Sequence, residues 1–351
     1  MSSERSRLIK NAIEENTRYL TGDSTYKTYD YMIEQGIIKK NKIVYKADDE
    51  ESEKKIDYKN TIIDNFDNNT EKMVDFFEEY EYNKSYKYSV VKEINISNDA
   101  LTKKLSDLAK KSIISLKTDN YIRYFKNPTL QKFDDVFCLK FSYTIGPKSN
   151  CFAYPVIATI YPNKKLLIIS FDSIPYNFKD RKDIYQHIVI SVRTWVEKNL
   201  SIGTKEIKLL QMVKDIINIK NADKKSFIDI NEYVRDGYDK RGGRFKMIAD
   251  DNDEMSFLDQ LSKIAESLST KEDREKLNKF IHEISNNMMF VERGLTWKSY
   301  NGRKSKMTMT IRDNFINDEM SLIHFYDNNW ERKRVIYGIE YIIDYKSKVK
   351  K

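Results

Sequence analysis

The sequence predicts an α+β fold, because its strand-like segments cluster together instead of alternating with helices. Three consecutive segments are rich in aromatic and β-branched residues, which favour strands. These segments are residues 133–145, 152–161 and 165–171. The dipeptides Gly146-Pro147 and Pro162-Asn163 lie between them and are typical of turns. We therefore expect an antiparallel three-stranded meander.

Helical periodicity predicts helices packed around this meander. In the first part of the chain they are residues 3–20, 24–35, 71–81 and 98–116, with a strand over residues 86–96. Asp180 is placed to cap a long amphipathic helix that ends near Leu200. Four more helical segments form a helical block, and they are residues 205–219, 227–236, 255–268 and 271–288.

A second, small β unit is expected at the C-terminus. Its strand-like segments are residues 295–300, 306–312, 322–326 and 334–345. Asn301-Gly302, between the first two, is typical of a type I′ hairpin turn. The chain then divides into four regions: an N-terminal helical and hairpin region (1–82), an α+β domain with the meander (83–203), the helical block (204–290) and a β-rich unit (291–351).

Residues 37–46 and 55–63 predict a β-hairpin that follows two helices. This order resembles a winged-helix module, in which a helix enters the major groove of DNA and the hairpin contacts phosphate. The tip of this hairpin is acidic and would repel DNA. We therefore expect the region to be an ordinary helical cap on the domain.

Composition indicates a cytoplasmic protein that does not enter membranes. No apolar run approaches the roughly 18 residues that span a bilayer, and the N-terminus has no secretory signal. Cys138 and Cys151 are then expected to be reduced thiols. The abundance of Lys, Asn, Ile and Tyr is typical of AT-rich genomes, and it is compatible with a mobile-element, phage or antiviral-defence origin.

The net charge of +8 conceals a separation of charge. Residues 47–82 contain thirteen acids and four lysines, so this acidic segment carries −9 and the rest of the chain carries +17. A basic body attracts polyanions. The acidic segment is expected to be a solvated loop, or to modulate access to the body, engage a partner, or mediate self-association.

The signatures of common enzymes are largely missing. The chain has no phosphate-cradling glycine loop, no Gly-x-Ser-x-Gly and no His-Glu-x-x-His. Its two cysteines and three histidines are scattered, which does not indicate a zinc site. We expect no cofactor and, more generally, no catalysis.

Two residue sets nevertheless support a nuclease as an alternative. Arg181 and His187 have the spacing of the Arg-x4–6-His motif and over these seven residues resemble HEPN ribonucleases, which implies a general acid or base beside a phosphate-binding arginine. Asp135 opens the first meander strand and Asp172 closes the third, and two such carboxylates would suit Mg²⁺. The simpler interpretation of both sets is structural.

Basic and aromatic residues alternate in several places, which suits phosphates and unpaired bases. The candidate nucleic-acid-binding residues are Lys110, Lys111, Arg123, Tyr124, Lys126, Arg241, Arg244, Lys246, Trp297, Lys298, Arg303 and Lys304. We therefore expect a protein that binds DNA or RNA mainly through backbone and electrostatic contacts. A nuclease, or a protein–protein interaction subunit that pairs acidic and basic faces, remains an alternative.

Overall fold

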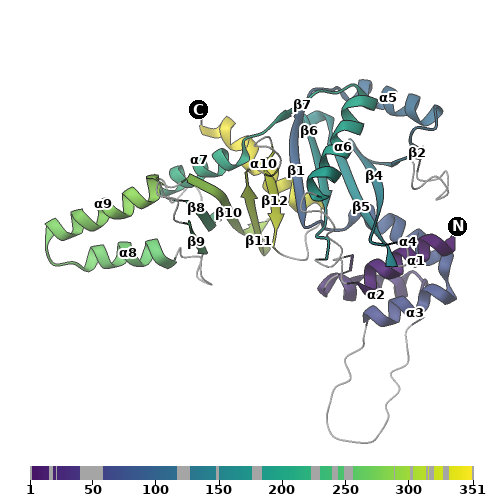
Figure 1. Cartoon of the computed structure of the whole chain (residues 1–351), viewed down its shortest axis with the longest axis horizontal. Coiled ribbons are helices and arrows are strands. Elements are labelled where there is room, and N and C mark those ends of the chain that lie inside the picture. Colours follow the sequence, from purple (N-terminus) through teal and green to yellow (C-terminus); the bar gives the residue numbers. More distant parts are fainter. Residues whose placement is uncertain are drawn as a thin grey trace, which may run out of the picture. The chain divides into compact units, whose positions relative to one another are not determined.

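The structure is a computed structural model (Figure 1). It describes residues 2–15, 19–20, 22–39, 58–116, 127–147, 150–175, 184–222, 230–238, 244–248, 256–287, 289–300, 303–313, 315, 320–326 and 332–349. Contacts between residues divide the chain into two compact units. Unit 1 is formed by Met1–Lys87 and Lys92–Lys205, and unit 2 by Tyr88–Val91 and Glu206–Lys351.

Unit 1 contains a mixed sheet in the order β2-β3-β4-β5-β6-β1. Its strands are β1 (Tyr88–Ile94), β2 (Ser115–Leu116), β3 (Thr129–Phe133), β4 (Val136–Ile145), β5 (Phe152–Tyr161) and β6 (Leu166–Phe171). Strands β3 to β6 pair antiparallel in sequence order, and β2 runs parallel to β3. The expected α+β class is confirmed, but the sheet is larger than a three-stranded meander.

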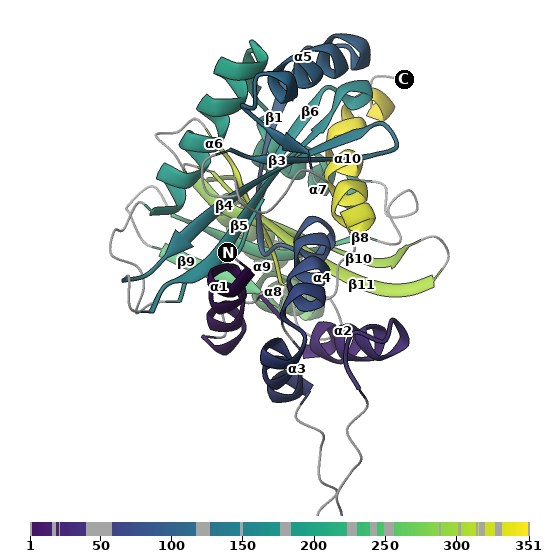
Figure 2. The ribbon, with the colours of Figure 1, turned by 90° about the vertical axis from the view of Figure 1, so that its right-hand side faces the viewer.

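Helices cover both faces of this sheet, which explains why all ten residues of β5 are buried. On β4, Lys140 points toward α4 (Thr70–Asn83), whereas the ring of its neighbour Phe141 packs on Trp195 of α6 (Ile184–Leu200). Adjacent residues of a strand face opposite sides, so α4 and α6 lie on opposite faces. Helix α1 (Ser2–Glu14) contacts β5 and α4, and α5 (Asn98–Lys110) contacts α6 (Figure 2).

The N-terminal region is helical where it is described. Helix α2 (Gly22–Glu34) contacts α3 (Tyr58–Asn68), so the strand predicted over residues 55–63 is wrong. Ile62 and Phe66 lie one helical turn apart and are fully buried, and this burial on one helix face selects helix over strand. The strand predicted over residues 37–46 falls almost entirely outside the described residues.

Unit 2 contains an antiparallel sheet in the order β12-β11-β10-β8-β9, and Tyr88–Val91 of β1 pairs with β12. Its strands are β8 (Ile230–Tyr238), β9 (Arg244–Ile248), β10 (Met289–Tyr300), β11 (Arg303–Arg312) and β12 (Leu322–Phe325). Helix α7 (Leu209–Ala222) contacts β10, β11 and α10 (Arg332–Val349), while α8 (Ser256–Ser267) and α9 (Lys271–Asn287) form a helical hairpin (Figure 1). A short strand, β7 (Thr204–Glu206), pairs with β1.

Two sequence-based element predictions in unit 2 are wrong. Residues 227–236 were expected to be helical, but β8 occupies the described part of that segment and pairs with β10, about sixty residues later. Residues 334–345 were expected to be a strand, but they lie in α10. Ile339, Ile342 and Tyr345 of α10 are buried at helical spacing, so packing overrides the β-branched and aromatic composition.

Gly338 allows α10 to approach the sheet closely. A Cβ atom at this position would lie 2.7 Å from Met307 Cε and 3.8 Å from Trp297. Gly338→Ala is expected to change the free energy of unfolding little, because the end of the methionine side chain can move and alanine favours helix. Gly338→Leu is expected to cost roughly 1–3 kcal/mol by overpacking. Denaturant unfolding of both variants measures the difference, and equal stability would show that α10 is not close-packed here.

Two further structural facts bear on the sequence-based expectations. Cys138 and Cys151 are both buried, and they form no disulfide with each other. Among the helices of the described ranges, none combines the length and the apolar character that a bilayer-spanning segment needs.

Candidate nucleic-acid interface

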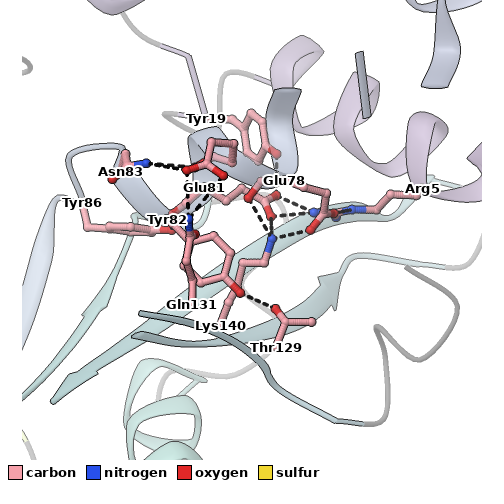
Figure 3. Close-up of polar contacts among 11 residues, drawn as sticks. Arg5, Tyr19, Glu78, Glu81, Tyr82, Asn83, Tyr86, Thr129, Gln131 and Lys140 are labelled. Carbon is pink, nitrogen blue, oxygen red and sulfur yellow. Dashed lines mark hydrogen bonds and ion pairs between the residues drawn. The ribbon is translucent and has the colours of Figure 1, made fainter. Parts of the chain in front are cut away.

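A buried network of charged side chains occupies unit 1 between α1, α4 and β4 (Figure 3). Arg5 Nε donates to Glu78 at 2.7 Å, and Arg5 Nη2 donates to Glu81 at 2.6 Å. Lys140 Nζ donates to Glu78 and, at 2.9 Å, to Glu81. All four side chains are at most 5 % exposed. Two cations thus neutralise two carboxylates inside the core.

Hydrogen bonds and cations determine the protonation of this network. Burial favours the neutral carboxyl of Glu81, but the charges of Arg5 and Lys140 and a hydrogen bond from Tyr19 outweigh it and lower the pKa of Glu81 to about 2. Burial also raises the pKa of Tyr82 and Tyr86, so both phenols stay neutral. The network is therefore ionic at Glu81 and neutral at the phenols of Tyr82 and Tyr86.

The network changes the interpretation of the acidic segment. Residues 58–82 form α3 and most of α4, and they do not form a solvated loop. Glu78 and Glu81 point into the protein and pair with Arg5 and Lys140, so they are not available to a basic partner. Residues 47–57 of the segment lie outside the described residues.

Of the four speculative catalytic residues, the three that the structure describes do not form a site. Asp135 is exposed and accepts a hydrogen bond from Asn163 at 3.2 Å. Asp172 is buried and forms an ion pair with Lys84 at 2.5 Å. His187 is exposed on α6, and Arg181 lies outside the described residues.

The register of β4, β5 and β6 separates the two aspartates. Phe137, two residues after Asp135, pairs with Ile160 at one end of β5, whereas Ser170, two residues before Asp172, pairs with Ile157. Extended by two residues, the register places Asp135 beyond one end of β5, whereas it places Asp172 toward the other end. The two carboxylates are therefore roughly 20 Å apart along the strands. One Mg²⁺ cannot bridge that distance. Over the described part of the chain, no three His, Cys, Asp or Glu side chains are grouped to hold a metal ion.

The candidate nucleic-acid-binding residues are distributed over both units. Lys110 and Lys111 are exposed at the C-terminal end of α5 in unit 1, where cations also stabilise the end of a helix. Lys298, Arg303 and Lys304 belong to the strands β10 and β11 of unit 2, and Arg244 and Lys246 are exposed on β9. The candidates outside the described residues are Arg123, Tyr124, Lys126 and Arg241.

Trp297 was predicted as a stacking residue, and the structure corrects this. Its side chain is 1 % exposed, and its ring packs on Tyr341 of α10 at 6.1 Å between centroids. Trp297 alternates along β10 with the residues of the opposite sheet face, so the pleat directs it into the core of unit 2. The ring is not accessible to a base.

Strand pairing does bring Arg244 and Lys246 together with a cation that the sequence reasoning missed. Lys246 pairs with Asp236, Asp236 pairs with Glu292, and Glu292 pairs with Arg312. These residues therefore share one face of the sheet, opposite the face on which the buried Met309, Ile311 and Trp297 lie. We call Arg244, Lys246 and Arg312, all exposed, the basic row.

The positive charges of the basic row lie nearer to solvent than the carboxylate of Asp236. Asp236 is buried below it, with a side chain 2 % exposed, whereas the side chain of Arg244 is 55 % exposed. Arg244 donates from Nε at 3.2 Å and from Nη2 at 2.8 Å. These hydrogen bonds lower the pKa of Asp236 against the opposing effect of burial, and the charges of Arg244, Lys246 and Arg312 lower it further. Glu292 lies in the same row between Asp236 and Arg312 and is half-buried, so an incoming anion meets three exposed cations and two less exposed carboxylates.

The sequence contained a usable signal for Arg312. It follows Thr308 and Thr310 at every second position of a predicted strand, and such residues share a face. What the sequence did not provide was the order of the strands, which alone places Arg312 on the same row as Lys246.

Known proteins offer no further assignment. Comparisons with protein-family models, with curated proteins and with solved structures gave no significant match.

Proposed function

We propose that unit 2 binds nucleic acid through its phosphate backbone, with the basic row as the contact surface. The observation that carries this proposal is the convergence of Arg244, Lys246 and Arg312, from two different strands, around one buried aspartate. Three strand spacings separate Lys246 from Arg312, or about 14 Å, which is the length of about four stacked nucleotides. A backbone can therefore run along the row.

The geometry of Arg244 suits a phosphate. A guanidinium has five N–H donors in a planar fork, and the contacts with Asp236 orient this fork through Nε and Nη2. Nη1 carries two further donors and lies on the exposed side chain. An arginine held in place by a buried carboxylate loses little rotamer entropy when it binds an anion.

The alternative functions receive less support from the described residues. A metal-dependent nuclease would need Asp135 and Asp172 together, and strand register separates them. A subunit that pairs acidic and basic faces would have fewer carboxylates available than the composition indicates, because Glu78 and Glu81 form internal ion pairs, although Asp64, Asp67, Glu71 and Asp75 are exposed. Binding to the backbone of a nucleic acid requires only the exposed cations of unit 2.

The test is the salt dependence of binding to a fluorescent strand of about 20 nucleotides and to the matching duplex. Each phosphate contact that is lost reduces the slope of log K against log salt by about 0.7 to 0.9. The double variant K246A/R312A is therefore expected to reduce the slope by about 1.4 to 1.8 for the form that binds.

The comparison variant K110A/K111A removes the same charge from the end of α5 in unit 1. It is expected to leave the slope unchanged, because its lysines are not part of the basic row. Equal losses in the two double variants would mean that binding follows total charge. Binding of neither nucleic acid by the wild-type chain at low salt would end the proposal.

A further inference from the structure

Three aromatic rings lie beside the basic row on the same face of the unit 2 sheet. Tyr88 of β1 pairs with His324 of β12, and their ring centroids are 5.0 Å apart. Tyr326 follows His324 by two residues, and these two centroids are 4.2 Å apart. Tyr326 is 37 % exposed, and the other two rings are half-buried. We call Tyr88, His324 and Tyr326 the ring ladder.

The ring ladder is distinct from the hydrophobic core. Ile323 and Phe325 alternate with the ring ladder along β12 and lie on the opposite face of the sheet, where each is at most 1 % exposed. The hydroxyl of Tyr326 lies 3.5 Å from Oε1 of Glu292, whose strand partners are Asp236 and Arg312. Tyr326 therefore adjoins Glu292, and its backbone N–H bonds to Thr308, four residues before Arg312 on β11.

Rings in register across two strands also stabilise the pairing of those strands. That role explains Tyr88 and His324, which are direct partners in register. It does not require Tyr326, which follows the last residue of β12 and keeps more than a third of its surface in solvent. Tyr326 therefore keeps accessible surface that strand pairing does not use.

We infer that Tyr326 stacks on an unpaired base, so that the ligand of unit 2 is single-stranded nucleic acid; this inference rests on the proposed function. In a duplex each base is covered on both faces by its neighbours, whereas a single strand can turn a base outward onto an aromatic side chain. The base lies on Tyr326 and the adjoining phosphates lie along the basic row. Stacking of this kind tolerates any base, which agrees with recognition of backbone more than of sequence.

The experiment compares Tyr326→Ala with Tyr326→Phe on three probes, a mixed-sequence strand, the matching duplex and an abasic strand of equal length. Tyr326→Ala is expected to weaken binding of the mixed-sequence strand about tenfold. The slope of log K against log salt stays the same, because stacking releases no counterions. Tyr326→Phe keeps the ring and is expected to bind like the wild type, and the abasic strand is expected not to distinguish the three proteins.

Tyr31→Ala is the matched control, since Tyr31 is a similarly exposed tyrosine on α2 in unit 1. It is expected to bind all probes like the wild type. If the duplex binds as tightly as the strand and Tyr326→Ala has no effect, the inference is overturned, while dependence on the basic row keeps the proposed function intact. If K246A/R312A also has no effect on any probe, both the inference and the proposed function are contradicted.

Discussion

Replacing Lys140 with methionine is expected to lower the free energy of unfolding by about 3–5 kcal/mol. Lys140 is 1 % exposed and is one of two cations that neutralise Glu78 and Glu81. Methionine has a similar length and is apolar, so the packing volume is kept while one positive charge is lost. The core then holds two carboxylates and only Arg5, and the desolvation of the excess negative charge is no longer offset.

Denaturant unfolding measures this loss. The double variant K140M/E78Q separates charge from shape, because it also removes one of the two carboxylates. Arg5 then faces a single carboxylate, Glu81, so the double variant is expected to recover part of the stability that Lys140→Met loses. Lys276→Met, which breaks an exposed pair with Glu272 on α9, is expected to have little effect. A loss in Lys140→Met no greater than in Lys276→Met would show that the network does not stabilise unit 1.

Acid is expected to destabilise unit 1 between about pH 5 and pH 2 through Glu81. The pKa of Glu81 is lowered from its ordinary value of 4.5 to about 2 in the folded protein. A carboxyl with a lowered folded pKa contributes its full stabilisation above its unfolded pKa and loses it as the pH falls through the folded pKa. The difference corresponds to about 3 kcal/mol.

The measurement is the free energy of unfolding as a function of pH for the wild type and for Glu81→Gln. Glutamine keeps the shape of the side chain but does not titrate, so the variant is expected to be less stable at neutral pH and to show a flatter profile below pH 5. Parallel profiles for the two proteins would assign the acid sensitivity to other groups.

Local patterns predicted the strands β4 to β6 because their residues are aromatic or β-branched and are bounded by turn residues. They failed for α10, whose composition is equally β-like. Its buried residues recur every three positions, at Ile339, Ile342 and Tyr345, and this spacing was the better signal. They also failed for β8, because a strand whose partner β10 lies far along the chain has no local cause.

The sequence indicated the buried network less clearly than it indicated the strands β4 to β6. Glu78 and Glu81 lie on the same face of α4 as Val74, and a carboxylate on an apolar helix face needs a partner. The partners, Arg5 and Lys140, are at least fifty-nine residues away, so only the folded chain identifies them.

The candidate interface was predictable only in part. Arg244 and Lys246 were named as candidates from the sequence, but they share a face only because they lie two residues apart in β9, a strand that the sequence analysis did not predict. Trp297 was assigned to that surface by its residue type, and the pleat of β10 placed it in the core. Tyr88 joined the ring ladder from a strand more than two hundred residues before His324, which no local pattern indicates.

Photo-crosslinking with a single strand that carries iodouracil, followed by mapping of the attached peptides, tests the central claim most directly. We expect attachment in unit 2, at Tyr326 and at the strands that carry the basic row, and we expect K246A/R312A to reduce it. Attachment confined to unit 1, such as at the lysines that end α5, would contradict the assignment of nucleic-acid binding to this face.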